Sequence, residues 1–338
     1  MGVIKVGTSG WADRLLLSSG WYPRSVNTPA GRLAYYAERF PLVEVDTTYY
    51  ALPSVETVAA WVERTPPDFT FNVKAYRLFT GHPTPAGTLP ADLRPAADRV
   101  GAVGLRRRDL PESAYDALWE RFHSTLRPLV EAGKLGVVLL QFPPWLVHGD
   151  AGRRRITDTV RRCRPLRVAV ELRHGSWFRD DTILETLDLL RRQDATLVCV
   201  DMPQGHPSSV PPVLVATSDR AMVRFHGHST QWHTGDKQEK FRYAYGDLEL
   251  DRWAELLREL SDQAGELHVL MNNCCGDQAQ RDAARLAQRL ARLPAPRSPA
   301  APGGARGGAG TTGSGADSRS GGPGRLGGAR RTGTRNAG

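Results

Sequence analysis

Long apolar runs, secretion signals and nucleotide-binding glycine motifs are all missing from this sequence of 338 residues. No apolar stretch approaches the roughly 18 residues that a membrane span needs, so we expect no membrane protein. The first residues, MGVIKVGTSGW, lack the charged-then-apolar order of a signal peptide and have the pattern of a strand. No Rossmann fingerprint or Walker motif is present. We therefore expect no dinucleotide site of the Rossmann type and no P-loop.

Cysteine is scarce and shows no pattern. Cys163, Cys199 and the adjacent pair Cys274 and Cys275 have no C-x-x-C spacing and no repeat. Disulfide frameworks and zinc sites both need such spacing, so the sequence predicts neither and favours a reduced, cytoplasmic setting. On these grounds we assign no metal ligands and leave the cofactor unknown.

Large apolar side chains are almost absent from residues 294–338. This segment holds seven Arg against one Asp, and so carries +6 of the net charge of +9, together with 14 of the 34 Gly. It cannot bury enough surface to offset its ordering entropy, so we predict a disordered tail after one folded domain over residues 1–293. Either it makes weak contact with nucleic acid or it is a solvated appendage without function.

What the first 293 residues do contain is an alternation of short β-branched runs and longer helical patterns. Near-continuous apolar strands with helices between them indicate a parallel sheet that is buried on both faces. Eight strands are predicted, over residues 4–9, 42–49, 69–75, 135–142, 167–173, 196–201, 221–227 and 266–273.

Helical periodicity is clear in several of the connections. Helices are predicted over 54–64, 111–132, 180–193, 247–263 and 278–292, while the proline-rich connection 202–218 is predicted to be mostly loop. Eight βα units in about 290 residues match the size of a single TIM barrel, an α/β fold. A doubly wound open sheet is the second choice. Residues 80–109 form a long insert after the third strand, either a lid over the barrel mouth or a decorative loop.

Polar side chains stand at the carboxyl ends of nearly all the predicted strands. Because side chains alternate along a strand, each set that shares a face can be followed to the strand's end. The polar residues found there are Asp46, Lys74, Gln141, Arg173, Asp201, His226 and Asn272. Each shares its strand face with the residue two positions earlier, which is Glu44, Asn72, Leu139, Glu171, Cys199, Arg224 or Leu270. TIM-barrel active sites lie at this end of the strands, which predicts one polar site.

Each member of this set also has a simpler interpretation. Glu171 with Arg173 is equally typical of a structural ion pair, and Asp201 could cap the next turn. A catalytic role for His226 is as plausible as a packing role. We interpret His82, His123, His148, His206 and His268 as ordinary core or surface groups. One shared site explains the whole set more economically than many separate structural roles.

Within that site we predict roles from side-chain chemistry. Glu171 is the expected base or nucleophile, with Asp46 or Asp201 as second carboxylate and His226 as an alternative proton carrier. Lys74, Arg173 and Arg224 are expected to contact an anion. The further residues predicted to bind substrate are Trp11, Tyr49, Gln141, His174, Trp177, Asn272 and Asn273. The alternative role for His174, whose parity is opposite to that of Glu171, is to orient a neighbouring side chain.

Nine motifs resemble, in order, those of the YecE-like family, also called domain of unknown function 72. They are GTSGW at 7–11, GWYP at 20–23, VEVDTTYYALP at 43–53, FNVKA at 71–75, LLQFPP at 139–144, VELRHGSW at 170–177, RFHG at 224–227, YAYGDLEL at 243–250 and MNN at 271–273. The resemblance implies a TIM-barrel-like fold with a polar pocket and no established reaction. The chain departs from the family pattern after MNN, where we would expect an aromatic residue near Cys275 and Asn near Asp282.

Three classes of function follow. The first is an enzyme acting on a small polar or anionic molecule, sugar-like or phosphorylated. The second is a metal-dependent lyase, isomerase or phosphodiesterase using Glu171, Asp201 and His226, which the nearby Arg and Lys side chains disfavour. The third is non-catalytic association with nucleic acid through the basic tail and residues 106–108.

Overall fold

Eight parallel strands close into a barrel in the computed structural model, which describes residues 2–95, 104–206, 208–232, 237–273 and 275–293. Each strand pairs with the next along the chain, and the last pairs with the first. The strands are β1 (Val3–Thr8), β2 (Leu42–Val45), β3 (Thr70–Lys74), β4 (Leu135–Gln141), β5 (Val168–Glu171), β6 (Ala195–Asp201), β7 (Arg220–Phe225) and β8 (Glu266–Met271). The predicted TIM barrel is confirmed and the open sheet is excluded.

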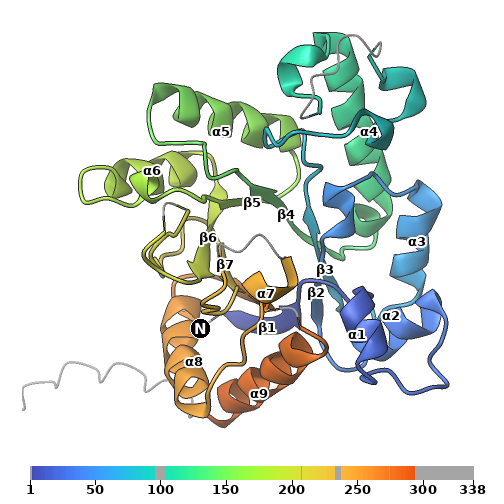
Figure 1. Cartoon of the computed structure of the whole chain (residues 1–338), viewed down its shortest axis with the longest axis vertical. Coiled ribbons are helices and arrows are strands. Elements are labelled where there is room, and N and C mark those ends of the chain that lie inside the picture. Colours follow the sequence, from blue (N-terminus) through green and yellow to red (C-terminus); the bar gives the residue numbers. More distant parts are fainter. Residues whose placement is uncertain (1, 96–103, 207, 233–236, 274, 294–338) are drawn as a thin grey trace, which may run out of the picture. The chain divides into compact units, whose positions relative to one another are not determined.

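A ring of helices surrounds the barrel (Figure 1). The five predicted helices are present as α3 (Val55–Glu63), α4 (Glu112–Glu131), α6 (Ile183–Arg192), α8 (Asp247–Ser261) and α9 (Gln278–Arg292). Four more were not predicted: α1 (Arg14–Ser18), α2 (Pro29–Ala37), α5 (Asp150–Cys163) and α7 (Lys237–Lys240). Helix α5 is rich in arginine but still has a buried apolar stripe, formed by Ile156, Val160 and Cys163.

The two predicted loop regions differ in character. The connection between β6 and β7 contains no helix in its described residues, as predicted. In the insert, Thr84 bridges to Leu105, and both Leu89 and Leu105 are buried in the main core. Asp92 of the insert pairs with Arg121 of α4. The described part of the insert is therefore anchored on α4. Residues 96–103 lie outside the described residues, and the lid remains a prediction.

The barrel interior is filled by one parity of each strand. Leu42, Leu139, Ala169, Met222 and Leu270 belong to a buried cluster separate from the main core between barrel and helices. Residues two further along these strands therefore point toward the barrel's carboxyl end. This alternation places the charged side chains at the carboxyl end of the barrel, next to the apolar cluster that fills its interior.

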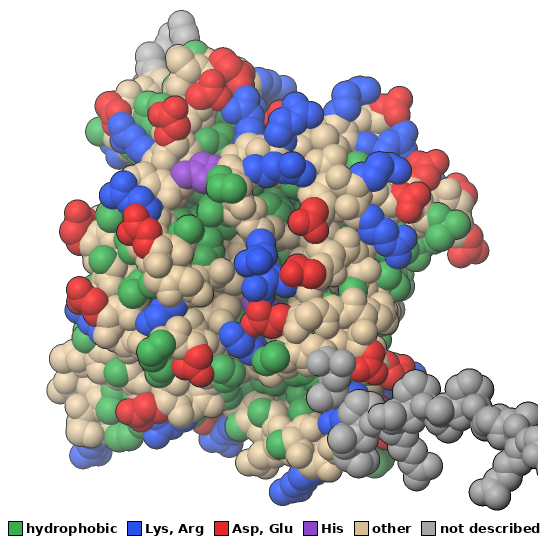
Figure 2. Space-filling view, turned by 180° about the vertical axis from the view of Figure 1, so that it is seen from behind, with side chains coloured by type: hydrophobic (Ala, Val, Ile, Leu, Met, Phe, Trp, Pro, Cys, Tyr) green, Lys and Arg blue, Asp and Glu red, His purple; other side chains and the backbone are tan. Residues whose placement is uncertain are grey.

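The surface carries charged side chains of both signs, and the described cysteines differ in burial. Figure 2 shows basic and acidic side chains interspersed on one face of the molecule. No helix in the described part of the chain is both long and apolar enough to cross a membrane. Cys163 and Cys199 are buried thiols, and Cys275 is partly exposed. Cys274 and the predicted disordered tail lie outside the described residues.

Candidate active site at the carboxyl ends of the strands

A pocket of about 400 Å³ opens at the carboxyl ends of the strands. This size is within the range of small-molecule sites. Eight residues predicted for the site line it: Trp11, Asp46, Lys74, Gln141, Arg173, Arg224, His226 and Asn272. Seven of these residues were placed at the strand ends from the alternation of side chains, and Trp11 from its position after β1.

Arg224 of β7 lies at the centre of the pocket floor. Its side chain is 1% exposed. One terminal nitrogen lies 2.5 Å from Glu44 Oε1 of β2, and the other lies 2.5 Å from Glu171 Oε2 of β5. Arg224 Nε is buried and has no hydrogen-bond partner among the described residues. A single buried guanidinium thus joins carboxylates from two distant strands.

Glu171 is held as a carboxylate. Its Oε2 accepts from Arg224, and its Oε1 accepts from Arg173 Nη1 at 2.8 Å, so both oxygens are occupied. Burial by itself would raise the pKa of Glu171. The Arg224 charge, with smaller contributions from His226 and Arg173, outweighs burial and holds this pKa well below its usual range. Glu171 is therefore ionised at neutral pH.

Glu44 holds a proton more readily than Glu171 does. It is completely buried, and only its Oε1 has a partner, Arg224, whereas Oε2 has none among the described residues. Burial raises the pKa of Glu44 to about 7, because the opposing effect of Arg224 is smaller than the cost of desolvation. A group with this pKa, bordering a pocket, can both hold and release a proton at neutral pH.

His226 links the charged floor to β8. Its Nε2 lies 3.1 Å from Arg173 Nη1, and its Nδ1 lies 2.8 Å from the side-chain amide of Asn272. Because a guanidinium can only donate, the contact with Arg173 requires an unprotonated Nε2. Burial lowers the pKa of His226 to about 4, so the imidazole is neutral at physiological pH.

The walls combine charge with aromatic rings. Lys74 Nζ lies 3.3 Å from Asp46 Oδ1 and 4.9 Å from the centre of the Tyr49 ring. The guanidinium of Arg173 lies 5.7 Å from the centre of the Trp232 ring. Trp11 packs edge-on against Trp61 with ring centres 5.7 Å apart. The pocket can therefore offer cations and apolar ring faces to one ligand.

Asp201 does not reach this pocket, contrary to the sequence interpretation. In the pairing of β6 with β7, Val200 is opposite Arg224 and Asp201 is opposite Phe225. Paired residues share a face, so Val200 points inward with Arg224, while Asp201 points toward the helices with Phe225. A polar residue ends β6, but it has the wrong parity. Glu171, Asp201 and His226 therefore do not form the metal-ligand set considered from the sequence.

Four other predicted binding residues also lie outside the pocket lining. His174 Nδ1 accepts from the Ser176 backbone and caps a short turn. Trp177 is completely buried and donates to the Leu146 carbonyl. Asn273 is buried and donates to Asp282 at 2.8 Å, and Tyr49 only borders Lys74. These positions support the loops around the pocket and do not line it.

Several lining residues were missed from the sequence as site candidates. Glu44 was noted only for its parity with Asp46, and Trp61 of α3 was not considered as a site residue. Tyr50 lines the pocket in place of its neighbour Tyr49, and Phe241 enters from the long connection after β7. The first loop contributes residues 9–14, including Arg14. Of these, only Glu44 carried a usable signal, since it shares a face with Asp46.

In the region after MNN, where the chain departs from the family pattern, Asp282 has a structural role. Asp282 of α9 is completely buried. Its carboxylate accepts from Asn273, from the backbone N–H of Tyr245 and from Arg285. The acidic residue therefore joins three segments around the rim, in a structural role.

Comparisons with known proteins agree with this architecture. The family model described as "Protein of unknown function DUF72" matches residues 5–304. The UPF0759 protein YunF of Bacillus subtilis is 29% identical over 299 residues, covering 85% of this chain and 95% of YunF.

Solved structures of DUF72 proteins have the same fold. One from Enterococcus faecalis superposes with a TM-score of 0.70 at 24% identity, covering 88% of this chain and 99% of the other. One from Thermotoga maritima gives 0.66 at 29% identity, covering 86% and 100%. The present chain, in which a charged pocket stands at the end of an eight-stranded barrel, belongs to the DUF72 family of proteins of unknown function.

Proposed function

We propose that the protein is an enzyme that performs acid–base chemistry on a small anionic molecule, sugar-like or phosphorylated, in the pocket at the barrel mouth. The observation that carries the proposal is the pair of buried carboxylates on Arg224. Glu171 accepts from two guanidinium groups and Glu44 from one. Two titratable groups whose surroundings separate their pKa values are typical of acid–base sites.

In this proposal Glu44 transfers the proton. Its Oε2 is buried without a partner among the described residues and belongs to a side chain that lines the pocket. Leaving such an atom without a hydrogen bond costs about 1–3 kcal/mol, which a substrate hydroxyl or amine would recover. Glu171, expected from the sequence to be the base, instead holds Arg173 and Arg224 in place.

The anion is assigned to Arg173 and Lys74. No hydrogen bond to Nε or Nη2 of Arg173 forms within the described residues, so this edge of the guanidinium is available for two parallel bonds to a carboxylate or phosphate. Lys74 lines the same pocket. Trp11, Tyr50 and Phe241 add ring surfaces suited to the face of a sugar or another planar group.

The test uses the full chain with a panel of inorganic phosphate, sugar phosphates, acid sugars and nucleoside monophosphates. A ligand at a hundred times its Kd adds about 2.7 kcal/mol of stability, which thermal unfolding detects. We expect one compound class to stabilise the protein. Arg173→Ala and Lys74→Ala should remove that effect, and Glu44→Gln should preserve binding but abolish turnover of the compound.

The matched control is Arg179→Ala. Arg179 also follows β5, but its guanidinium is exposed and, among the described residues, pairs with the exposed Asp181. It should leave binding unchanged. Stabilisation that survives Arg173→Ala and Lys74→Ala would place the ligand elsewhere, and a panel without any binder would contradict the proposed substrate class.

A further inference from the structure

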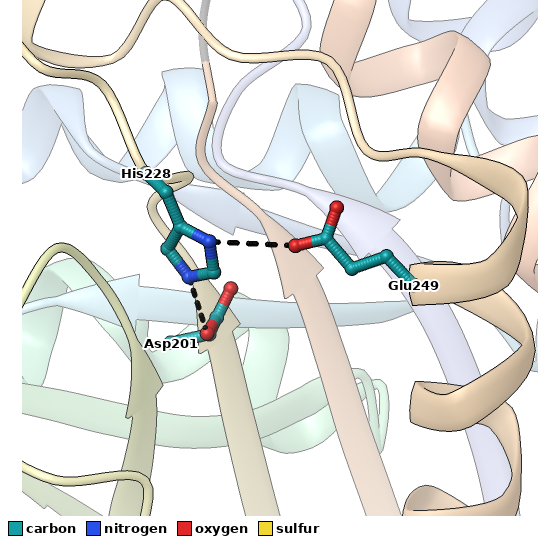
Figure 3. A group of neighbouring side chains, drawn as sticks. All are labelled: Asp201, His228 and Glu249. Carbon is teal, nitrogen blue, oxygen red and sulfur yellow. Dashed lines mark hydrogen bonds and ion pairs between the residues drawn. The ribbon is translucent and has the colours of Figure 1, made fainter.

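A second cluster of polar side chains lies on the outer side of β6, away from the pocket. Asp201 ends β6, His228 is in the connection after β7, and Glu249 is in the first turn of α8. Figure 3 shows the imidazole between the two carboxylates. His228 Nε2 lies 2.8 Å from Asp201 Oδ1, and Nδ1 lies 3.4 Å from Glu249 Oε1. One donor atom from each residue lies within 4.8 Å of the others.

We propose that Asp201, His228 and Glu249 bind a divalent transition-metal ion of the Zn²⁺ or Mn²⁺ type. The ligands are one imidazole nitrogen and one oxygen from each carboxylate. An imidazole combined with carboxylates suits these ions, whereas Mg²⁺ and Ca²⁺ prefer oxygen ligands alone. Three protein ligands with the remaining positions open to water are typical of an accessible zinc site.

The carboxylate of Asp201 is already oriented for this role. Tyr245 accepts a hydrogen bond from the backbone N–H of Gly227 and donates its own to Asp201 Oδ2 at 2.5 Å. This occupies one oxygen and leaves Oδ1 directed at His228. Carboxylate ligands of metals are commonly fixed by such outer hydrogen bonds, which reduce the ordering that metal binding requires.

Glu249 is held in a similar way. Its carboxylate accepts from the Tyr243 hydroxyl at 3.0 Å and from the backbone N–H of Gly246 at 3.2 Å. The second contact belongs to the first turn of α8, so the position of Glu249 depends on the start of that helix. Two tyrosine hydroxyls therefore support the two acidic ligands from outside.

Charge and access also fit a divalent ion. The side chain of Asp201 is 7% exposed, those of Glu249 and His228 are 26% and 38% exposed, and a cavity of about 420 Å³ adjoins all three. One face of the cluster is thus open to water. A divalent ion offsets both carboxylate charges, whereas one imidazolium offsets only one of them.

The movement needed is small. At zinc–ligand distances of about 2.0–2.2 Å, tetrahedral ligand atoms lie about 3.4 Å apart. Asp201 Oδ1 and His228 Nε2, now 2.8 Å apart, must separate by about 0.6 Å. Glu249 must approach by roughly the difference from 4.8 Å, and its side chain is long and partly exposed.

Zn²⁺ titration by calorimetry and Co²⁺ absorption spectroscopy on the full chain test the site. We expect His228→Gln and Glu249→Gln each to remove one bound Zn²⁺ equivalent, or to weaken it at least tenfold, and to abolish the visible Co²⁺ bands. Tyr245→Phe, which removes the hydrogen bond to Asp201 Oδ2 and the one from the Gly227 N–H but no ligand atom, should weaken binding about 10–100-fold. Circular dichroism checks that each variant is folded.

His148→Ala is the matched control. His148 also faces a carboxylate, Glu185 at 3.4 Å, but no second carboxylate pairs with it within the described part of the chain. This variant should bind Zn²⁺ as the wild type does, including at any adventitious surface site. The proposal is overturned if the wild type binds no more Zn²⁺ than His228→Gln and Glu249→Gln, or if the Co²⁺ spectrum is unchanged in these variants.

Discussion

Two buried carboxyl groups at the pocket, those of Glu44 and Glu171, differ in pKa because different numbers of guanidinium groups contact them. Glu44 and Glu171 are both completely buried. Glu171 accepts from Arg173 and Arg224, whereas Glu44 accepts from Arg224 alone. Burial penalises both carboxylates, and only the second guanidinium overcomes it. The same side-chain type is therefore held ionised in one place and has a raised pKa in the other.

This difference predicts a pH-dependent stability that belongs to Glu44. Its pKa is raised from 4.5 to about 7 on folding, so between these values the folded protein holds a proton that the unfolded chain has released. The free energy of unfolding contributed by Glu44 must then fall as the pH rises from about 4.5 to about 7. Glu44→Gln removes this contribution.

The measurement is urea unfolding of the wild type and of Glu44→Gln at several pH values. The stability of the wild type relative to the variant should decline across this window. His226, whose pKa is lowered to about 4, adds the opposite slope to both proteins and cancels in the comparison. Parallel stability curves would show that Glu44 is ionised throughout.

Arg224 should be the most costly charged residue to remove. Arg224→Met leaves Glu44 and Glu171 buried, and of the two guanidinium groups described here only that of Arg173, which contacts Glu171, is then left. Breaking a buried pair in this way costs about 3–5 kcal/mol. Arg179→Ala breaks only an exposed pair and should cost less than about 1 kcal/mol. Urea unfolding at neutral pH compares the two, and equal losses would contradict the buried ion pairs.

At the scale of elements, register decides which side chains meet. Gln141 pairs with Glu171 across β4 and β5, and Val200 pairs with Arg224 across β6 and β7. Paired residues point to the same side, so the mouth receives a polar group from β4, β5 and β7 but an apolar one from β6. Because Val200 and not Asp201 points into the mouth, Asp201 lies on the outer side of β6, in the separate cluster with His228 and Glu249.

The junction of β1 with β2 requires a glycine. A Cβ atom on Gly7 would lie 1.9 Å from the carbonyl oxygen of Leu42, a backbone atom that cannot rotate away. Gly7→Ala should therefore destabilise the protein by about 1–3 kcal/mol or more, because the two strands must separate. Gly87→Ala, whose Cβ meets nothing within 4 Å, should change stability by less than about 0.5 kcal/mol. Thermal unfolding of both variants checks this, and a stable Gly7→Ala protein would argue against this pairing.

At the scale of the whole molecule, the described core lies within residues 1–293, in the barrel, its helices and the connections between them. The buried residues run from Val6 to Leu286. Removing residues 294–338 should therefore leave the unfolding temperature unchanged. If the basic tail contacts nucleic acid, the same deletion should abolish oligonucleotide binding, which in the full chain should weaken steeply with salt. Calorimetry and binding at two salt concentrations measure both effects, and a lower unfolding temperature on deletion would contradict a separate tail.

The sequence by itself determined the fold and the place of the pocket. Strands of a parallel barrel are buried on both faces, so each is visible as an apolar run, and all eight were found. Alternation along those strands placed seven residues of the pocket lining at the strand ends. The short helices α1 and α7 and the arginine-rich α5 were not found, since brief or highly charged helices leave little periodic signal.

Only the tertiary structure decided which charges share a site. Glu44, Glu171 and Arg224 are far apart in the chain, and their protonation states depend on how many guanidinium groups reach each carboxylate. The inward parity of β6 depends on its pairing with β7, and sequence alternation alone cannot supply that pairing. Local periodicity is a property of each strand, whereas burial, register and charge sharing arise only between strands.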